Sequence, residues 1–262
     1  MANLKFEDLL DAGVHFGHLK RKWNPGMAPY IFDEKKGIHI IDLNKTIVKI
    51  DEAANAIKQI AKSGRKILFV ATKKQAKDIL ETKVAETNMP FISERWPGGM
   101  LTNFKTTRKT IRKMSSIDKM MKDGTADTMS KRERLQMTRQ REKMSKIFGC
   151  VMDMSRLPAA IFIVDIKKEH IALAEAKNLN IPVFAMVDTN SNPSDVDFVI
   201  PSNDDATKSI DLVLTTMCDA VKEGLGERKA SKEKADAAAQ KEKAAKQEKE
   251  EAAVAETTEE TK

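Results

Sequence analysis

The fold is decided by one stretch of sequence, AAIFIVDIKKEHIALAEAKNLNIPVFAMV (159–187). It begins with an apolar, mostly β-prone run at 159–164, continues with a helical pattern over 168–178 and ends in a second apolar run at 183–187. Two parallel strands need a crossover connection, and that connection is usually a helix. The stretch therefore predicts a strand–helix–strand unit of an α/β fold.

The same alternation extends in both directions along the chain. The predicted strands lie at 38–42, 66–71, 91–92 and 198–200, and the predicted helices at 45–61, 75–87 and 205–223. Before them, the pattern predicts a short helix opening into a turn over 6–19 and a loop over 20–37. Strands alternating with helices predict a doubly wound, mainly parallel sheet of the flavodoxin-like or Rossmann-like kind.

One basic segment interrupts this alternation. Residues 105–147 hold 14 Lys and Arg against 5 Asp and Glu, a net charge of +9, whereas the whole chain carries only +7. Apolar residues recur every three or four positions on both sides of DGTADTMS (123–130). We therefore expect two helices joined by a turn, which form an inserted α-helical coiled-coil hairpin over 105–150.

The hairpin divides the remaining chain into two further parts. We expect a discontinuous α/β domain, made of residues 1–104 plus 151–224, and a low-complexity Ala/Lys/Glu tail, 225–262. The tail holds 9 Lys and Arg against 10 Asp and Glu and contains no aromatic residue. It offers too little apolar area to offset the entropy lost on ordering, so we expect a disordered tail with transient helix at most.

Composition and missing motifs narrow the class of function. A basic chain favours an anionic partner such as nucleic acid or an acidic membrane face. The two cysteines form no CxxC pair, and there is no targeting segment or long apolar run, so we expect a cytoplasmic protein without a membrane partner. The sequence lacks GxGxxG after a strand, GxxxxGK[ST] and GxSxG, so we expect no enzyme, no cofactor and no small-molecule substrate.

Two segments place cations beside groups that can contact RNA. LKRKWNP (19–25) joins three cations to a Trp, and RWPGGMLTNFKT (95–106) joins hydrogen-bond donors to a double Gly that permits positive φ or close backbone approach. In the alternative interpretation, Trp23 packs on its own domain and the second segment is a turn that launches the hairpin, with Trp96 in the core. The candidate RNA-binding residues are Lys20, Arg21, Lys22, Trp23, Asn24, Arg95, Asn103, Lys105, Arg108, Lys109 and Arg112.

A few His and Asp residues could instead bind a metal ion. His15 and His18 lie close together in sequence, and Asp188, Asp204 and Asp205 lie at predicted strand ends or helix starts, where α/β folds bind ligands. Such Asp residues are more often turn formers and helix N-caps. We therefore assign no metal site, and whether a divalent ion lies near His18, Asp188 and Asp205 stays open.

Several long motifs resemble, in the same order, those of one protein family. FEDLLDAGVHFGH (6–18), RKWNPGMAPYIF (21–32) and GIHIIDLNKT (37–46) resemble the N-terminal block of the small-subunit ribosomal protein S-two family, bacterial branch. The segment 95–106 resembles its central signature, 158–182 its second signature, and VDTNSNP (187–193) and IPSNDDA (200–206) its C-terminal block. The resemblance covers residues 6–222 and departs at Pro97, where many members have Leu.

The resemblance implies an α/β domain with an inserted hairpin and a structural role in translation. It implies binding to small-subunit ribosomal RNA and neighbouring ribosomal proteins, between the head and the body of the subunit. It also implies recruitment of the large RNA-binding ribosomal protein S-one. Two other functions stay open at this point, namely an α/β enzyme with a lid-like helical insertion and a free translation factor or RNA chaperone.

Overall fold

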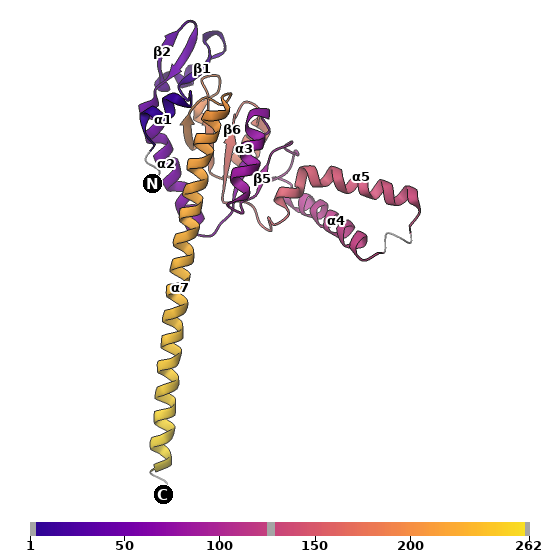
Figure 1. Cartoon of the computed structure of the whole chain (residues 1–262), viewed down its shortest axis with the longest axis vertical. Helices are drawn as coiled ribbons and strands as arrows, with labels where there is room; N and C mark the ends of the chain where they lie inside the picture. The colour runs from indigo at the N-terminus through magenta and orange to yellow at the C-terminus, as the bar shows by residue number, and fades with distance from the viewer. Residues whose placement is uncertain (1–3, 125–128, 260–262) are drawn as a thin grey trace.

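The centre of the molecule is a five-stranded parallel sheet with the strand order β5-β4-β6-β7-β8 (Figure 1). The computed structural model describes residues 4–124 and 129–259, with side chains through Glu233. The strands are β4 Ile67–Val70, β5 Phe91–Ile92, β6 Ala160–Val164, β7 Val183–Val187 and β8 Phe198–Pro201. Numbered along the chain, this order is 2-1-3-4-5, the flavodoxin-like arrangement. The predicted fold class is confirmed.

The sheet is covered on both faces, which explains why its strands read as continuous apolar runs. Every residue of β4, β6 and β7 is buried. One face packs under α2 Leu43–Lys62, α3 Lys74–Ala85 and the start of α7 Thr207–Glu259. The other face packs under α6 His170–Asn178, the turn around Met100 and the first turns of α4 Phe104–Lys122. Burial on both faces is the usual environment of a parallel sheet.

The predicted helical hairpin is present as α4 and α5 Lys131–Phe148, which project together from the body (Figure 1). On α4 the residues Thr107, Ile111, Met114 and Ile117 are buried, at helical spacing. No residue of α5, which the structure describes in full, is buried. The two helices are also joined by an ion pair between Arg141 Nε and Asp118 Oδ1 at 2.7 Å. Each arm is about 30 Å long at 1.5 Å per residue.

The N-terminal region differs from the prediction. After α1 Phe6–Asp11, residues expected as a helix, a loop and a first parallel strand form a separate antiparallel sheet with the order β1-β3-β2. Its strands are β1 Phe16–Leu19, β2 Ile31–Lys35 and β3 Ile38–Ile41, with two short 3-10 helices, η1 Lys20–Lys22 and η2 Pro25–Tyr30, between β1 and β2. The hairpin β2–β3 turns at Lys36 and Gly37, both at positive φ, as tight hairpin turns require.

The tail, for which we expect disorder with transient helix at most, follows the last packed helix of the body, and that expectation stays a prediction. The structure continues α7 as one helix through Glu259, and the helix axis leads away from the body (Figure 1). Ala, Glu, Lys and Gln are strong helix formers, and extending an existing helix requires no new nucleation. The packed part also extends past the expected boundary at 224. Leu225 packs against the core, and Glu227 pairs with Lys58 at 2.8 Å and Lys62 at 2.9 Å.

Candidate nucleic-acid interface

The first predicted RNA-binding segment lies beside the N-terminal sheet. The 3-10 helix η1 exposes the side chains of Lys20, Arg21 and Lys22. Lys20 Nζ pairs with Glu34 Oε2 at 2.6 Å, which partly neutralises it. Within the described part of the chain, no ion pair involves Arg21 or Lys22. These two cations are therefore the ones that η1 offers to an anion.

The two residues that follow have different surroundings. The Trp23 side chain is 36% exposed, and its ring centroid lies 5.1 Å from that of His39. It therefore packs partly on its own domain and keeps part of its surface open to a partner. Asn24 caps η2, because its Oδ1 accepts a hydrogen bond from the Gly26 N–H at 2.8 Å. The structure thus gives Asn24 a turn-forming role, and nothing in it places Asn24 against RNA.

The second predicted segment is organised by a carboxylate that the sequence analysis did not select, Glu175 of α6. Trp96 is buried, and its Nε1 donates to Glu175 Oε1 at 3.0 Å. The same carboxylate accepts the backbone N–H groups of Gly99, Leu101 and Thr102 at 2.7, 2.9 and 3.1 Å. Gly99 has φ +82°, as the double Gly predicted. The structure supports the alternative interpretation of this segment as a turn that launches the hairpin.

The charge on Glu175 is stabilised by these donors. Burial disfavours the ionised form, but the hydrogen bonds from Trp96 and from the three backbone N–H groups outweigh it and lower the pKa of Glu175 below its ordinary value. An ionised carboxylate that accepts several N–H groups holds a turn strongly, because hydrogen bonds to a charged group are stronger than neutral ones. The turn therefore fixes the direction in which α4 leaves the body.

The exposed face of α4 carries a row of cations. Lys105, Lys109, Arg112 and Lys113 are exposed, and within the described side chains no ion pair involves any of them. We call these four residues the α4 stripe, because positions four and seven or eight residues apart lie on one face of a helix. Three of its members were predicted from the sequence. The stripe begins two residues after Asn103, whose carbonyl accepts the N–H groups of Thr106 and Thr107.

The other predicted residues near the hairpin differ in their contacts. Arg108 Nη1 donates to the Ser155 carbonyl at 2.8 Å, so it links α4 to the loop that precedes β6. Arg95 is exposed just before the Glu175-bound turn, and no ion pair in the described part of the chain involves it. In Figure 1 the N-terminal sheet lies at one end of the body and the hairpin projects from another side. The predicted residues thus form two cationic surfaces rather than one.

A polar cluster, largely buried except for the exposed Asp205, occupies the carboxyl edge of the parallel sheet, where doubly wound enzymes bind their ligands. Its centre is Lys73, whose Nζ lies 2.8 Å from Asp204, 2.6 Å from Asp205 and 3.4 Å from Asp165. Burial opposes the charge on Lys73, but the carboxylates outweigh it and raise its pKa. Burial, together with the charges of Asp188 and Asp165, raises the pKa of Asp204. An internal ion-pair cluster therefore occupies this edge.

His18 adds a nitrogen ligand to the same cluster. Its Nδ1 lies 2.9 Å from Asp188 Oδ2 and its Nε2 lies 3.5 Å from Asp205 Oδ2, and the hydrogen bond with Asp188 raises the pKa of His18. Ligand atoms of His18, Asp188 and Asp204 lie within 4.8 Å of one another. One divalent cation could reach all three, since imidazole and carboxylate groups are common metal ligands. His15 is not part of this group.

Comparison with known proteins connects these features to one family. The family model described as Ribosomal protein S2 matches residues 9–224. The chain belongs to this family. It is 63% identical to the small ribosomal subunit protein uS2 of Parabacteroides distasonis, over 91% of this chain and 86% of the relative. It is 66% identical to the protein of that name from Flavobacterium johnsoniae, over 89% of this chain and 92% of the relative.

Membership of the ribosomal protein S2 family gives the coarse function. The chain is a structural protein of the small ribosomal subunit, takes part in translation and is not an enzyme. The family resemblance derived from the sequence motifs is therefore confirmed. Among the residues that the structure describes, no helix is both long and apolar enough to cross a membrane.

Proposed function

We propose that this S2 family member binds small-subunit ribosomal RNA chiefly through the α4 stripe. In this proposal it works in the cytoplasm, between the head and the body of the small subunit, and contacts neighbouring ribosomal proteins there. The observation that supports the proposal is a row of cations without ion pairs, within the described residues, on an arm that projects from the folded body. Lys and Arg neutralise phosphates, and folded RNA is recognised largely by shape and backbone contacts. Arg21, Lys22 and Trp23 supply a second, smaller contact.

Salt washing of ribosomal subunits tests this proposal. Small subunits from the host, pelleted through sucrose after a moderate salt wash, should retain the chain in a one-to-one ratio with the other subunit proteins. Salt weakens each phosphate contact, but a chain that makes many such contacts starts from a high affinity and should stay bound through a moderate wash. Recovery of the chain in the supernatant, with the other proteins still in the pellet, would contradict tight binding of the chain to the ribosomal RNA.

A second function is favoured by exposed apolar side chains on the N-terminal sheet. Phe32 is 75% exposed and Phe16 is 51% exposed, and Leu19 is also exposed. Large apolar side chains at the surface mark protein-binding sites more often than RNA-binding ones, and aromatic residues are enriched in protein interfaces. We infer that this sheet helps to recruit ribosomal protein S-one.

Replacing Phe32 by Ser should release S-one from the subunit while leaving the chain bound. Loss of an aromatic anchor from an interface costs about 2 kcal/mol or more, which is about 30-fold in affinity. Quantitative mass spectrometry of purified subunits would measure the ratio of S-one to this chain. Asp33→Ser, on the neighbouring exposed position of β2, is the matched control. An unchanged ratio in the Phe32 variant would remove this sheet from S-one recruitment.

A further inference from the structure

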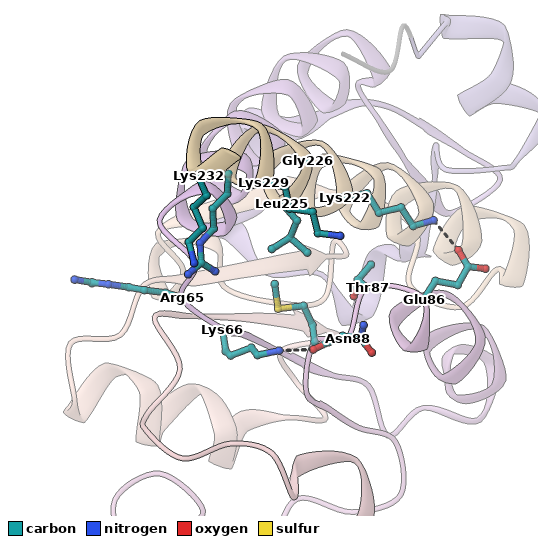
Figure 2. Close-up of a pocket in the computed structure, with 13 residues that line it drawn as sticks. Arg65, Lys66, Glu86, Thr87, Asn88, Lys222, Leu225, Gly226, Lys229 and Lys232 are labelled. Atoms are coloured by element: carbon teal, nitrogen blue, oxygen red, sulfur yellow. Dashed lines mark hydrogen bonds and ion pairs between the residues drawn. The ribbon is translucent and has the colours of Figure 1, made fainter. Parts of the chain in front are cut away.

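A basic groove lies at the amino edge of the parallel sheet, where Arg65 and Lys66 lead into β4 (Figure 2). It has a volume of about 580 Å³ and runs between the segment that leads into β4, the segment that follows α3, and α7. Six of its lining residues are cations, namely Arg65, Lys66, Lys222, Arg228, Lys229 and Lys232. Glu86 is the carboxylate among the lining residues, and it already pairs with Lys222 Nζ at 2.6 Å.

Most of this charge is not used within the chain. Lys66 Nζ donates to the Asn88 carbonyl at 2.5 Å, which neutralises nothing. Within the described side chains, no ion pair involves Arg65, Lys229 or Lys232, and all three are exposed. Like charges gathered around one groove repel one another, so the arrangement favours an anion that lies among them.

The shape of the groove is set by α7 and by Gly64. Lys222, Leu225, Lys229 and Lys232 follow a spacing of three, four and three residues, so they share the helix face that turns toward the groove. On the opposite wall, a Cβ at Gly64 would come within 2.0 Å of Arg228 Cζ. The missing side chain at Gly64 therefore leaves room for the guanidinium group, and Figure 2 shows cations of α7 directed toward the loop that carries Arg65.

We propose that this groove binds the sugar–phosphate backbone of ribosomal RNA, as a surface separate from the α4 stripe. The inference rests on the proposed function, and it specifies a second part of the chain that carries it out. No aromatic side chain lines the groove, and its apolar floor is confined to Met89 and Leu225. Protein interfaces need apolar or aromatic anchors, whereas phosphate contacts need only well-placed cations. The groove therefore suits a phosphate backbone better than an acidic protein.

The groove also leads toward the hairpin. A neighbouring hollow shares Lys66, Asn88 and Met89 with it and is also lined by residues that follow α5, namely Gly149, Cys150, Asp153 and Met154. An RNA strand that lies in the groove would thus be directed toward the base of the arm that bears the α4 stripe. This surface is not visible in the sequence, because the tail as a whole is nearly neutral. Its first residues carry Arg228, Lys229 and Lys232, while Glu227 is occupied by Lys58 and Lys62.

A charge-removal variant of the full chain tests the groove. Arg65→Gln, Lys229→Gln and Lys232→Gln together should reduce the slope of log K against log salt for a small-subunit ribosomal RNA transcript by about 2, and weaken binding about a hundredfold at 0.1 M salt. The matched control, Arg65→Lys with Lys229→Arg and Lys232→Arg, keeps the charge and should bind nearly as the wild type does. Both variants should have the same melting temperature as the wild type, because the replaced side chains are exposed.

The outcomes separate this inference from the proposed function. If the wild type binds the transcript and the neutralised variant keeps its slope, the groove is not an RNA surface, while the hairpin proposal stands. If the wild type does not bind the transcript, both proposals fail. Chemical acetylation of lysines, measured by mass spectrometry, would locate the RNA contact on the chain. Lys229 and Lys232 should be protected when the transcript is the only partner present. Protection in intact subunits but not by the transcript would assign the groove to a protein partner and overturn the inference.

Discussion

Replacing the four residues of the α4 stripe, Lys105, Lys109, Arg112 and Lys113, by Gln should weaken binding to small-subunit ribosomal RNA about a thousandfold at 0.1 M salt. Each lost phosphate contact removes a fixed number of released counterions, so the slope of log K against log salt should fall by about 3. The four side chains are exposed, so the fold should survive the change. Filter binding over a range of salt concentrations measures both quantities.

A charge-conserving variant of the stripe is the matched control. Lys105→Arg, Lys109→Arg, Arg112→Lys and Lys113→Arg keep all four charges on the same helix face and should leave the slope unchanged. An unchanged slope in the Gln variant would show that the stripe does not contact phosphate. The hairpin would then be better explained as an arm that binds a neighbouring protein.

Replacing Glu175 by Ala should lower the free energy of unfolding by about 3–5 kcal/mol, since each buried donor left without an acceptor costs 1–3 kcal/mol. The substitution leaves the buried Trp96 Nε1 and the buried N–H of Leu101 without their carboxylate, and it also removes the acceptor of Gly99 and Thr102. Urea denaturation followed by circular dichroism measures the loss. Because the turn sets the direction of α4, a protease should also cleave the hairpin faster in the variant than in the wild type.

Two comparisons check this role of Glu175. Glu175→Gln keeps one acceptor oxygen and should lose less stability than Glu175→Ala. The pKa of Glu175 is lowered in the folded chain, so its stabilising contribution is present above the ordinary value of 4.5 and disappears as the pH falls through the folded pKa. The difference between wild type and Glu175→Ala should therefore shrink in acid. Equal stability of both proteins at neutral pH would contradict the role.

The parallel sheet could be predicted because its strands are buried on both faces. AIFIV (160–164) and VFAMV (183–187) are continuous apolar runs. The helix between them is a crossover connection, which joins parallel strands. The N-terminal sheet could not be predicted in the same way. Strand β2, IFDEK, is largely exposed. Strand β3 lies between β1 and β2, and both of these strands precede it in the sequence. Short antiparallel strands of this kind carry little periodic signal.

Cations that lie close together in the sequence could be predicted as part of the candidate site. Cations that only folding brings together could not. The α4 stripe lies within one helix, so its spacing is visible in the sequence. The basic groove combines residues near 65, 88 and 229, and nothing local marks them as neighbours. Glu175 was missed for the same reason, because its donors lie more than 70 residues away. Arg108 was selected for its charge, but the structure shows it bound to the Ser155 carbonyl.

A cryo-EM map of the host's small ribosomal subunit would locate the hairpin relative to the ribosomal RNA and so show whether the α4 stripe contacts it. We expect Lys105, Lys109 and Arg112 to lie within hydrogen-bond distance of phosphate oxygens, with the direction of α4 set by the turn bound to Glu175. A map in which this face of α4 contacts only solvent or protein, with ribosomal RNA out of reach of all three side chains, would contradict this expectation.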